Sequence, residues 1–413
     1  MSFESISDIR VGLRFNDETL LVGHLAKRDR KIYFEYESSF IDSGLEISPI
    51  EYSLKPGVHS CDPLILEGLP GVFNDSLPDG WGRLLLDRQN NSLGIPPKVL
   101  SPLDRLTHVG SAGMGALVYE PDYTSKMSDN KIDIALLAEH TWQILAGEAI
   151  DVLDELIALN GSSSGARPKA MIGLHKNRQD ITHGTCQLQV DYEPWLVKFP
   201  NSNDGADAGA VEYVYALMAR DAGLAMPDIH LFPSSKKGSG YFAVKRFDRQ
   251  NGKRLHMHTA CGLLHSDFRI PSLDYEDLIA LTMKLTRNIK EVEKIYRLAV
   301  FNVLAHNRDD HAKNFSFLMN ETGEWNLSPA YDLTFSSGPN GEQSTMVMGE
   351  GRNPGKADLV KLGLEAKLPQ STIDEIIEQT RTALSKWTQL AKKYGVSHAN
   401  IKLIDAAIAK IGG

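Results

Sequence analysis

Three polar residues towards the C-terminal end of the chain have the types and the order that phosphoryl transfer requires. Asn314 follows Asp309 by five positions, and Asp332 lies further on in the segment LSPAYDL. Phosphoryl transfer needs a carboxylate that orients the attacking hydroxyl group and hard oxygen ligands that hold magnesium between the phosphates. The pattern therefore predicts that Asp309 orients the hydroxyl group and that Asn314 and Asp332 bind Mg²⁺.

The segment between Asn314 and Asp332 shows how two distant ligands could meet. FSFLM and WNLSP have apolar, strand-like patterns, and NETGE between them is typical of a turn. A β-hairpin here would bring the two residues close together. The alternative is that the charged residues of NRDDHAK only form a solvated turn held by salt bridges. The order Asp, Asn, Asp, flanked by apolar strands, favours the site.

A lysine on a strand is the next group that a kinase needs, because it contacts the α- and β-phosphates of ATP. Lys198 in WLVKFP fits this role, since Leu196, Val197 and Phe199 place it in an apolar strand. A buried lysine requires an anionic partner. Glu212, in the following helical segment, could supply it. The alternative is an exposed Glu on the outer face of that helix.

The segment GSSSGARPKA, residues 161–170, could form a loop over the phosphates. Gly161 and Gly165 permit close approach of the backbone, and serine hydroxyls and backbone amides can bind phosphate oxygens. The spacing differs both from a Walker A loop and from the G-x-G-x-x-G loop of protein kinases. A flexible Gly/Ser connector is the alternative. The position of the segment ahead of Lys198 favours a phosphate-binding loop.

Hydrophobic periodicity indicates which elements position these groups. Alternating apolar residues at 11–15 and 32–36 predict strands in the N-terminal section. The segment LPDGWGRLLLDRQN predicts a helix that closes this section, with Asp79 as its N-cap. A helical pattern over 132–159 and further strands and a helix precede a mainly helical remainder. We therefore expect three parts: a β-rich N-terminal subdomain at 1–108, a mixed α/β nucleotide-binding lobe at 109–262 and a mainly helical catalytic lobe at 263–413.

Composition and charge exclude several classes of protein. The 413 residues carry a formal net charge of −9, which argues against direct, nonspecific binding to nucleic acid. Cys61, Cys186 and Cys261 are too few and too widely spaced for a disulfide framework or a zinc motif, which indicates a reducing compartment. The sequence has no apolar run of about 18 residues and no secretory signal. A cytoplasmic protein without membrane contact is expected.

Together, the motifs resemble those of the HipA-like serine/threonine kinases, the toxin components of bacterial toxin–antitoxin pairs. The resemblance covers nearly the whole chain and rests on LPDGWGRLLLDR, GARPKA, WLVKFP, KRFDR, NRDDHAKNFSF and SPAYDL. It implies an α+β fold, with a protein-kinase-like two-lobed core, a β-rich N-terminal subdomain and an all-helical C-terminal lobe. It also implies that ATP binds between the lobes with Mg²⁺ and that Ser or Thr residues of proteins are phosphorylated.

The resemblance implies a role for each residue that matches a family motif. Asp309 would be the catalytic base, Asn314 and Asp332 the magnesium ligands, and Lys198 the phosphate-contacting lysine. Ser162 would be the autophosphorylated serine, with its neighbours Ser163 and Ser164 as alternatives. Contacts to ATP would come from the Gly/Ser-rich loop, the hinge and the catalytic segment, namely Ser164, Gly165, Ala166, Arg167 and Lys169, then Lys245, Arg246 and Phe247, then His311 and Lys313.

Relatives of this family indicate kinds of partner but no particular substrate. The expected partners are a protein substrate, such as an aminoacyl-tRNA synthetase of the translation machinery, and a small helix-turn-helix antitoxin that binds operator DNA. Contact with DNA would then be indirect. Two alternatives stay open from the sequence: a corepressor or interaction module with weak catalysis, and a small-molecule phosphotransferase on a similar core.

Overall fold

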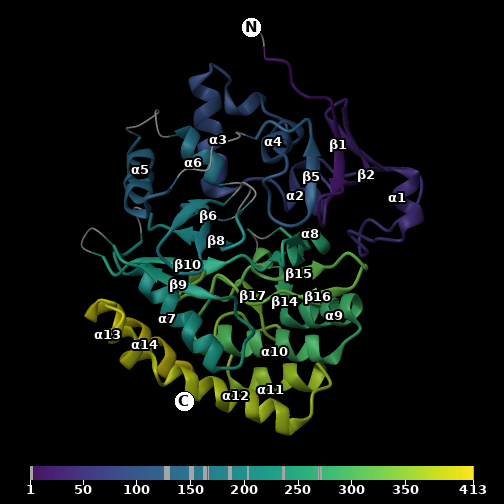
Figure 1. Cartoon of the computed structure of the whole chain (residues 1–413). Helices are drawn as coiled ribbons and strands as arrows, with labels where there is room; N and C mark the ends of the chain where they lie inside the picture. The colour runs from purple at the N-terminus through teal and green to yellow at the C-terminus, as the bar shows by residue number, and fades with distance from the viewer. Residues whose placement is uncertain are drawn as a thin grey trace.

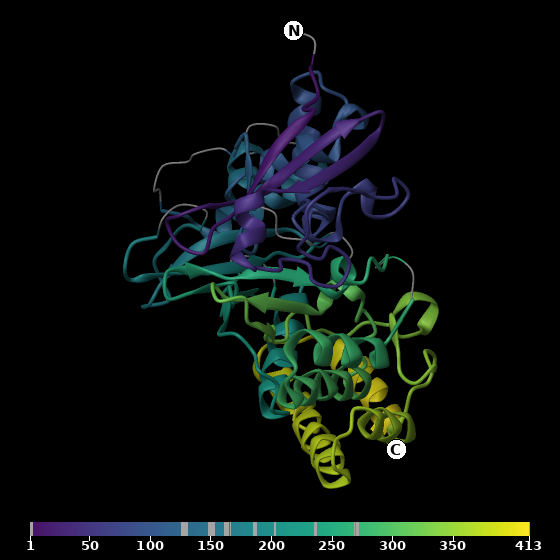
Figure 2. The same cartoon turned by 90° about the vertical axis from the view of Figure 1, so that its right-hand side faces the viewer.

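The computed structural model describes residues 3–124, 131–147, 153–160, 165, 167–184, 188–201, 204–234, 238–267, 269 and 272–412. In Figure 1 the N-terminal part lies at the top, with the helices of the middle part beside it; the strands of the middle part lie below, and the C-terminal helices lie at the bottom. The view turned by 90° shows the same order (Figure 2). Within the described ranges, no helix is both long enough and apolar enough to cross a membrane.

The N-terminal part is built on a five-stranded antiparallel sheet with the strand order β4-β3-β2-β1-β5. Alternate residues of β1 and β3, such as Val11, Leu13, Ile32 and Phe34, are buried in its core. The predicted N-terminal strands are therefore confirmed. The elements are β1 (Asp8–Leu13), β2 (Leu20–Arg28), β3 (Lys31–Tyr36), α1 (Ser38–Ser43), β4 (Val58–Ser60), η1 (Leu66–Gly68), α2 (Gly71–Asn74), α3 (Gly80–Ser92), η2 (Pro97–Val99), α4 (Pro102–Val109) and β5 (Leu117–Glu120).

The middle part is a second five-stranded antiparallel sheet, with the strand order β7-β6-β8-β10-β9. Trp81 and Leu85 of α3 join α5, α6 and this sheet in one core, so α3 belongs to the middle core as well as to the N-terminal part. The helical pattern expected over 132–159 forms two helices. The elements are α5 (Ile134–Ala146), α6 (Leu153–Asn160), β6 (Lys169–His175), β7 (Ile181–His183), β8 (Tyr192–Lys198), α7 (Ala208–Asp221), β9 (Ile229–Phe232) and β10 (Tyr241–Lys245).

The C-terminal part is mainly helical and carries a three-stranded sheet, β13-β15-β16. β15 and β16 pair antiparallel, which confirms the hairpin predicted ahead of Asp332. The sheet elements are β11 (Arg249–Gln250), β12 (Lys253–Arg254), β13 (His256–Thr259), β14 (Leu273–Asp274), β15 (Ser316–Met319), β16 (Trp325–Leu327) and β17 (Thr345–Met346). The helices are α8 (Ala260–Leu263), α9 (Tyr275–Thr286), α10 (Ile289–Leu304), η3 (Ala312–Asn314), η4 (Pro339–Gly341), α11 (Lys356–Glu365), α12 (Gln370–Leu384), α13 (Trp387–Lys393) and α14 (His398–Gly412).

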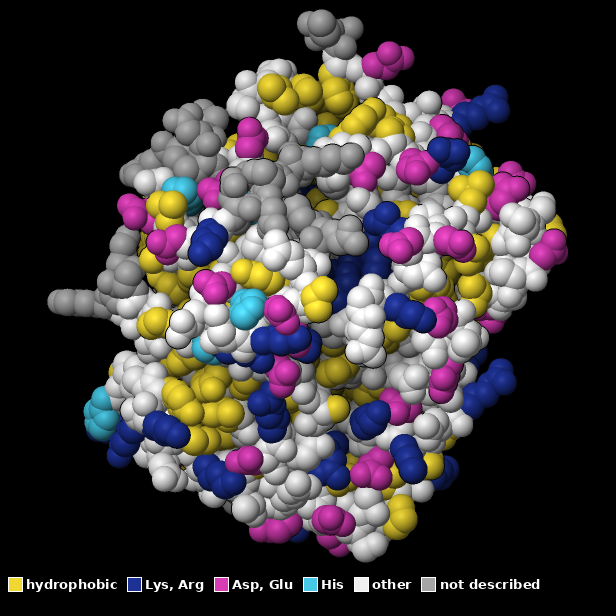
Figure 3. Space-filling model, in the orientation of Figure 1, with side chains coloured by type: hydrophobic (Ala, Val, Ile, Leu, Met, Phe, Trp, Pro, Cys, Tyr) yellow, Lys and Arg dark blue, Asp and Glu magenta, His cyan; other side chains and the backbone are white. Residues whose placement is uncertain are grey.

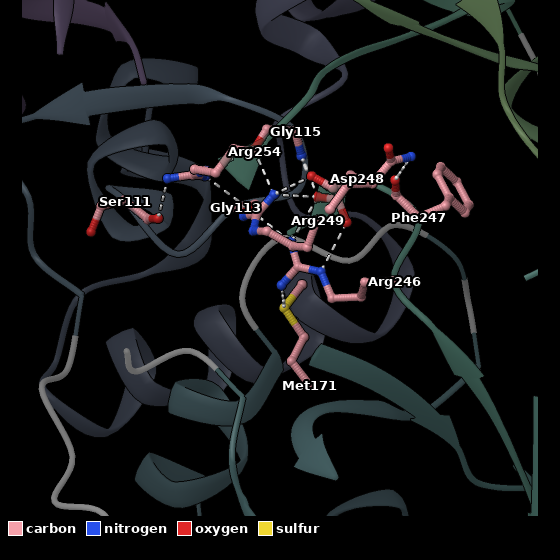
Figure 4. Close-up of polar contacts among 10 residues, drawn as sticks. Ser111, Gly113, Gly115, Met171, Arg246, Phe247, Asp248, Arg249 and Arg254 are labelled. Atoms are coloured by element: carbon pink, nitrogen blue, oxygen red, sulfur yellow. Dashed lines mark hydrogen bonds and ion pairs between the residues drawn. The ribbon is translucent and has the colours of Figure 1, made fainter. Parts of the chain in front are cut away.

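A cluster of buried charges joins the N-terminal part to the segment that follows β10 (Figure 4). Arg246 and Arg249 form ion pairs with Asp248 at 2.8 Å and 2.6 Å. The guanidinium groups of Arg246, Arg249 and Arg254 also donate to backbone carbonyls of the 111–115 loop. We call these four residues the arginine cluster. Because nearly all of its donors meet protein acceptors, the cluster acts as a structural junction.

A second polar junction lies between α2 and α8. Asp75 accepts hydrogen bonds from His258 Nδ1 at 2.6 Å and from the backbone N–H and side-chain hydroxyl of Thr259, each at 2.7 Å. A Cβ atom on Gly71 would lie only 2.0 Å from the carbonyl oxygen of Gly262, so the two backbones touch here. The N-terminal part is thus fixed against the core at two places.

Candidate active site

Lys198, the last residue of β8, lies at the centre of a buried network of charges. Its Nζ atom is 2.5 Å from Oε1 of Glu212 and 2.6 Å from Oδ1 of Asp332. Burial alone would lower the pKa of Lys198, but the Asp332 and Glu212 carboxylates outweigh burial and raise it. The lysine therefore stays charged at neutral pH.

Glu212 lies on the buried face of α7, and only 3% of its side chain is exposed. This position excludes the alternative of an exposed helix Glu. Burial raises the pKa of Glu212, while Lys198 works against that rise. Arg167 approaches the same carboxylate at 3.5 Å and Asp204 at 3.3 Å. Arg167, two residues before β6, is thus a second cation that contacts Glu212 of α7.

Asp332 follows the β15-β16 hairpin and reaches back to Lys198. Its backbone has a φ of 56°, a left-handed conformation that turns the chain sharply at this residue. Burial opposes ionisation of Asp332, but Lys198 and then Lys169 hold its pKa well below the ordinary value. About 38% of the side chain remains exposed. A charged, partly exposed carboxylate therefore lies at the edge of the network.

Asp309 and Asn314 lie on the segment after α10. The side-chain amide of Asn314 donates to the backbone carbonyl of Asp309 at 2.8 Å, which fixes the turn between them. Asp309 itself is exposed. Partial removal from water raises the pKa of Asp309, His311 opposes the rise, and Asp332 adds to it. The charges of Asp309 and Asp332 therefore interact. Among the described residues, no hydrogen bond joins Asn314 to Asp332.

The basic residues of the predicted nucleotide site also converge here. Lys169 pairs with Lys198 in the register of β6 and β8. Burial, followed by repulsion from Lys198, lowers the pKa of Lys169 to about 8. Lys313 is buried and forms an ion pair with Asp79 at 2.7 Å. The predicted loop residues Ser162, Ser163, Ser164 and Ala166 lie outside the described residues.

The predicted hinge begins at Lys245, the last residue of β10, and part of its backbone already forms hydrogen bonds within the protein. The N–H groups of Lys245 and Arg246 donate to the carbonyls of Asp228 and Pro194 at 2.8 Å and 2.9 Å. The Lys245 side chain pairs with Glu193, and that of Arg246 belongs to the arginine cluster. These two N–H groups are thus not available to a ligand. An adenine ring would have to use hinge carbonyls or the N–H of Phe247.

Three contributors to the site were not recognised from the sequence. Asp79 is predicted to cap a helix, but its side chain makes no capping hydrogen bond and contacts Lys313 instead. Tyr331 donates to the Lys313 carbonyl at 2.6 Å, and its ring lies 5.4 Å from that of Phe247. Asp310 is buried and accepts from Tyr275 at 2.7 Å. The only sequence signal was their position beside recognised motifs.

The residues present fit a magnesium ion that keeps several of its waters. No group of three or more His, Cys, Asp or Glu in the described part of the chain could hold a metal ion. The predicted ligands are one amide, Asn314, and one carboxylate, Asp332. Mg²⁺ is commonly bound through one or two protein ligands together with substrate phosphates. This donor set suits Mg²⁺ and does not suit a structural zinc ion.

Fold and site together define a kinase-like protein with two lobes and an additional β-rich N-terminal part. A model of the HipA N-terminal domain matches residues 16–120, and a model of the HipA-like C-terminal domain matches residues 161–387. The chain belongs to the HipA-like family. Among solved structures, it is similar to HipA of Shewanella oneidensis MR-1, in a complex with HipB and operator DNA. The TM-score is 0.67, at 16% identity over 97% of this chain and 96% of that one, a likeness of fold.

Two curated relatives from Sinorhizobium fredii are candidate kinases. Y4mE is 25% identical over 342 residues, which span 76% of this chain and 74% of that protein. Y4dM is 28% identical over 153 residues, which span 34% of this chain and 36% of that protein. The match to Y4dM thus spans about a third of that relative's length. The predicted family and the α+β, kinase-like fold are confirmed, and the helical lobe carries a small sheet as well.

Proposed function

We propose that the protein is an ATP- and Mg²⁺-dependent serine/threonine protein kinase of the HipA type. The observation that carries this proposal is the network in which Lys198 binds both Glu212 and Asp332. Kinases need such a lysine, with its ion-pair partner on a helix, to hold the phosphates. Its combination with Asp309 and Asn314 on the neighbouring segment matches the requirements of phosphoryl transfer.

Each residue has a definite task in this mechanism. Lys198 supplies a fixed positive charge for phosphate oxygens, and Glu212 keeps it in place. Asn314 and Asp332 offer the oxygen ligands. When bound, ATP would supply the phosphoryl group, and Mg²⁺ would neutralise the charge that develops on it. Asp309 accepts the proton of the substrate hydroxyl as the new O–P bond forms and the bond to the leaving phosphate breaks.

We further propose that the biological role is that of a toxin controlled by a small helix-turn-helix antitoxin. The HipA–HipB–DNA complex to which the fold is similar supports such a partner. The net charge of −9 supports contact with DNA through the antitoxin only. On the face shown in Figure 3, basic and acidic side chains are interspersed, and no continuous basic field covers it. The substrate proposed is a protein of the translation machinery.

Incubation with γ-labelled ATP, Mg²⁺ and a cell lysate tests the proposed activity. Label should enter protein on Ser or Thr, and the Asp309→Asn variant should transfer almost none. Separation of proteins from metabolites distinguishes a protein kinase from a small-molecule phosphotransferase. Label in metabolites alone, or equal transfer by Asp309→Asn, would contradict the proposal.

Autophosphorylation of Ser162 is a separate part of the proposal. A phosphoserine adds a charge of about −1.5 to −2, which would repel ATP phosphates in the same pocket. Mass spectrometry after incubation with Mg²⁺ and ATP should find one phosphate in the peptide 161–169, absent in Asp309→Asn. A phosphate on Ser163 or Ser164 would correct the position. An unmodified peptide would remove this part of the proposal.

A further inference from the structure

The first turn of α3 lies close to Asn160, just before the Gly/Ser-rich segment, and to Gly165 within it. A Cβ atom on Gly82 would lie 2.5 Å from Nδ2 of Asn160, the residue that ends α6. The backbone N–H of Trp81 donates to the carbonyl of Gly165 at 3.3 Å. The N–H of Gly165 in turn donates to Oδ1 of Asp79. One helical turn therefore lies against Asn160 and forms hydrogen bonds with Gly165, the described residues on either side of positions 161–164.

Asp79 is the N-cap residue of α3, yet its carboxylate does not cap the helix. An Asp at this position usually accepts a hydrogen bond from an N–H group of the first helical turn, and Asp79 does not make that contact. One oxygen of the carboxylate instead accepts a hydrogen bond from Gly165 N–H. The other accepts one from Lys313 Nζ at 2.7 Å. Burial opposes ionisation of Asp79, but Lys313 holds its pKa below the ordinary value. The residue is thus a charged bridge between two segments.

Both segments belong to the candidate active site. Lys313 lies between Asp309 and Asn314 in the sequence, and only 9% of its side chain is exposed. Its backbone carbonyl accepts a hydrogen bond from the hydroxyl group of Tyr331, which directly precedes Asp332. Gly165 has a φ of 112°, a backbone conformation that favours glycine, and it lies close to Nζ of Lys169. A shift of Asp79 would be transmitted to the phosphate side and the catalytic side of the site together.

We propose that Asp79 is a positioning residue for phosphoryl transfer, through which the first turn of α3 holds Gly165 of the Gly/Ser-rich segment in a fixed position relative to Lys313. This inference rests on the proposed kinase function. The N-terminal part would then contribute to the active site. Asp79 directly precedes α3, which belongs to the N-terminal part by its place in the sequence and packs in the middle core.

The charge of Asp79 gives the proposal a signature that a merely structural residue lacks. Lys313 and Lys169 both interact with this carboxylate. Removing its charge makes the surroundings more positive, so ATP should bind as tightly as before or more tightly. Turnover should fall at the same time, because misplacement of reacting groups by about 1 Å can lower rates by about a hundredfold. Affinity and turnover should therefore move in different directions.

The experiment compares Asp79→Asn and Asp79→Ala with the wild type. The Asn variant keeps one acceptor for Gly165 and loses the ion pair with Lys313, whereas the Ala variant loses both. We expect kcat to fall about tenfold for Asn and up to about a hundredfold for Ala. The Kd for ATP, measured by titration calorimetry, should be unchanged or lower in both. Asp87→Asn is the matched control, since Asp87 lies on the same helix and pairs with Arg105 at 2.8 Å.

Several outcomes would overturn the proposal. Wild-type kcat in both Asp79 variants would do so, as would a parallel loss of ATP binding, turnover and Tm, which indicates a purely structural role. If Asp79→Ala does not fold, Asp79→Asn in a Lys313→Gln background replaces it. The two substitutions should then cost less together than the sum of their separate effects. A wild-type protein that transfers no phosphate overturns the proposed kinase function instead, while full activity in the Asp79 variants overturns only this inference.

Discussion

The arginine cluster and the Lys198 network are both buried groups of opposite charges, but they differ in what satisfies them. In the arginine cluster, carbonyls of the 111–115 loop take most of the guanidinium donors, and Asp248 is fully buried. In the Lys198 network the partners are carboxylate side chains, and Asp332 is partly open to solvent. A cluster satisfied by fixed backbone acceptors holds a fold together, whereas partly open side-chain pairs can exchange partners for a ligand.

A perturbed pKa does not separate the two regions. Burial opposes ionisation of both Asp248 and Asp332, and neighbouring cations, Arg246 in one case and Lys198 in the other, hold both pKa values well below normal. The distinction lies in solvent access and in the kind of acceptor. Strong pKa shifts occur in structural ion pairs as well as in active sites.

The largest effect on turnover is expected for Asp309→Asn. The amide cannot accept the proton of the substrate hydroxyl, so phosphoryl transfer should fall by about 10²–10⁴-fold. Binding of ATP should persist, because Lys198 and Asp332 are unchanged. A radiolabel transfer assay and calorimetry with ATP measure the two quantities. Activity near that of the wild type would remove Asp309 from the catalytic role.

A smaller loss of turnover is expected for Lys198→Met, which removes the charge and keeps an apolar stem of similar length. Transfer should fall by about 10²–10³-fold. Unlike Asp309→Asn, this variant should also lose stability, because Glu212 is left buried with only Arg167 at 3.5 Å. Adding Glu212→Gln should restore Tm and leave the protein inactive. Recovery of activity in the double variant would show that the network is structural, like the arginine cluster.

For Asp248→Asn we expect the reverse pattern. Loss of the only carboxylate in the arginine cluster leaves buried guanidinium groups facing each other, which should cost about 3–5 kcal/mol of unfolding free energy. The folded fraction should turn over at nearly the wild-type rate, since no contact of the Lys198 network is removed. Thermal unfolding and kcat corrected for folded protein test this. A large fall in kcat without a change in Tm would place the arginine cluster in the catalytic machinery.

The smallest effect concerns pH. With a pKa lowered to about 8, Lys169 is charged at pH 7 and becomes neutral as the pH rises through 8. Loss of its charge weakens attraction for phosphate, so the Kd for ATP should increase severalfold between about pH 7 and pH 9. Lys169→Met should show a flatter profile over this interval. Identical pH profiles for the two proteins would mean that Lys169 does not contribute to nucleotide binding.

The parts of the fold that follow from local patterns were predictable. Alternation marked β1 and β3, and the turn-like NETGE between two apolar runs marked the β15-β16 hairpin. The helix that begins within LPDGW was also predictable, but its packing on the middle sheet was not. A periodic apolar face shows that a helix is buried on one side, and it does not show which core receives that side.

The sequence by itself determined the chemical types at the candidate site, because Asp309, Asn314, Asp332 and Lys198 stand in an order that phosphoryl transfer explains. Only the tertiary structure decided how they pair. In the folded protein Glu212 is buried, and Asp332 forms an ion pair with Lys198. Asp79, which the sequence predicts as a helix cap, forms an ion pair with Lys313 instead. The physical reason is that spacing along a chain limits local conformation, whereas the partner of a buried charge depends on which distant segments fold against it.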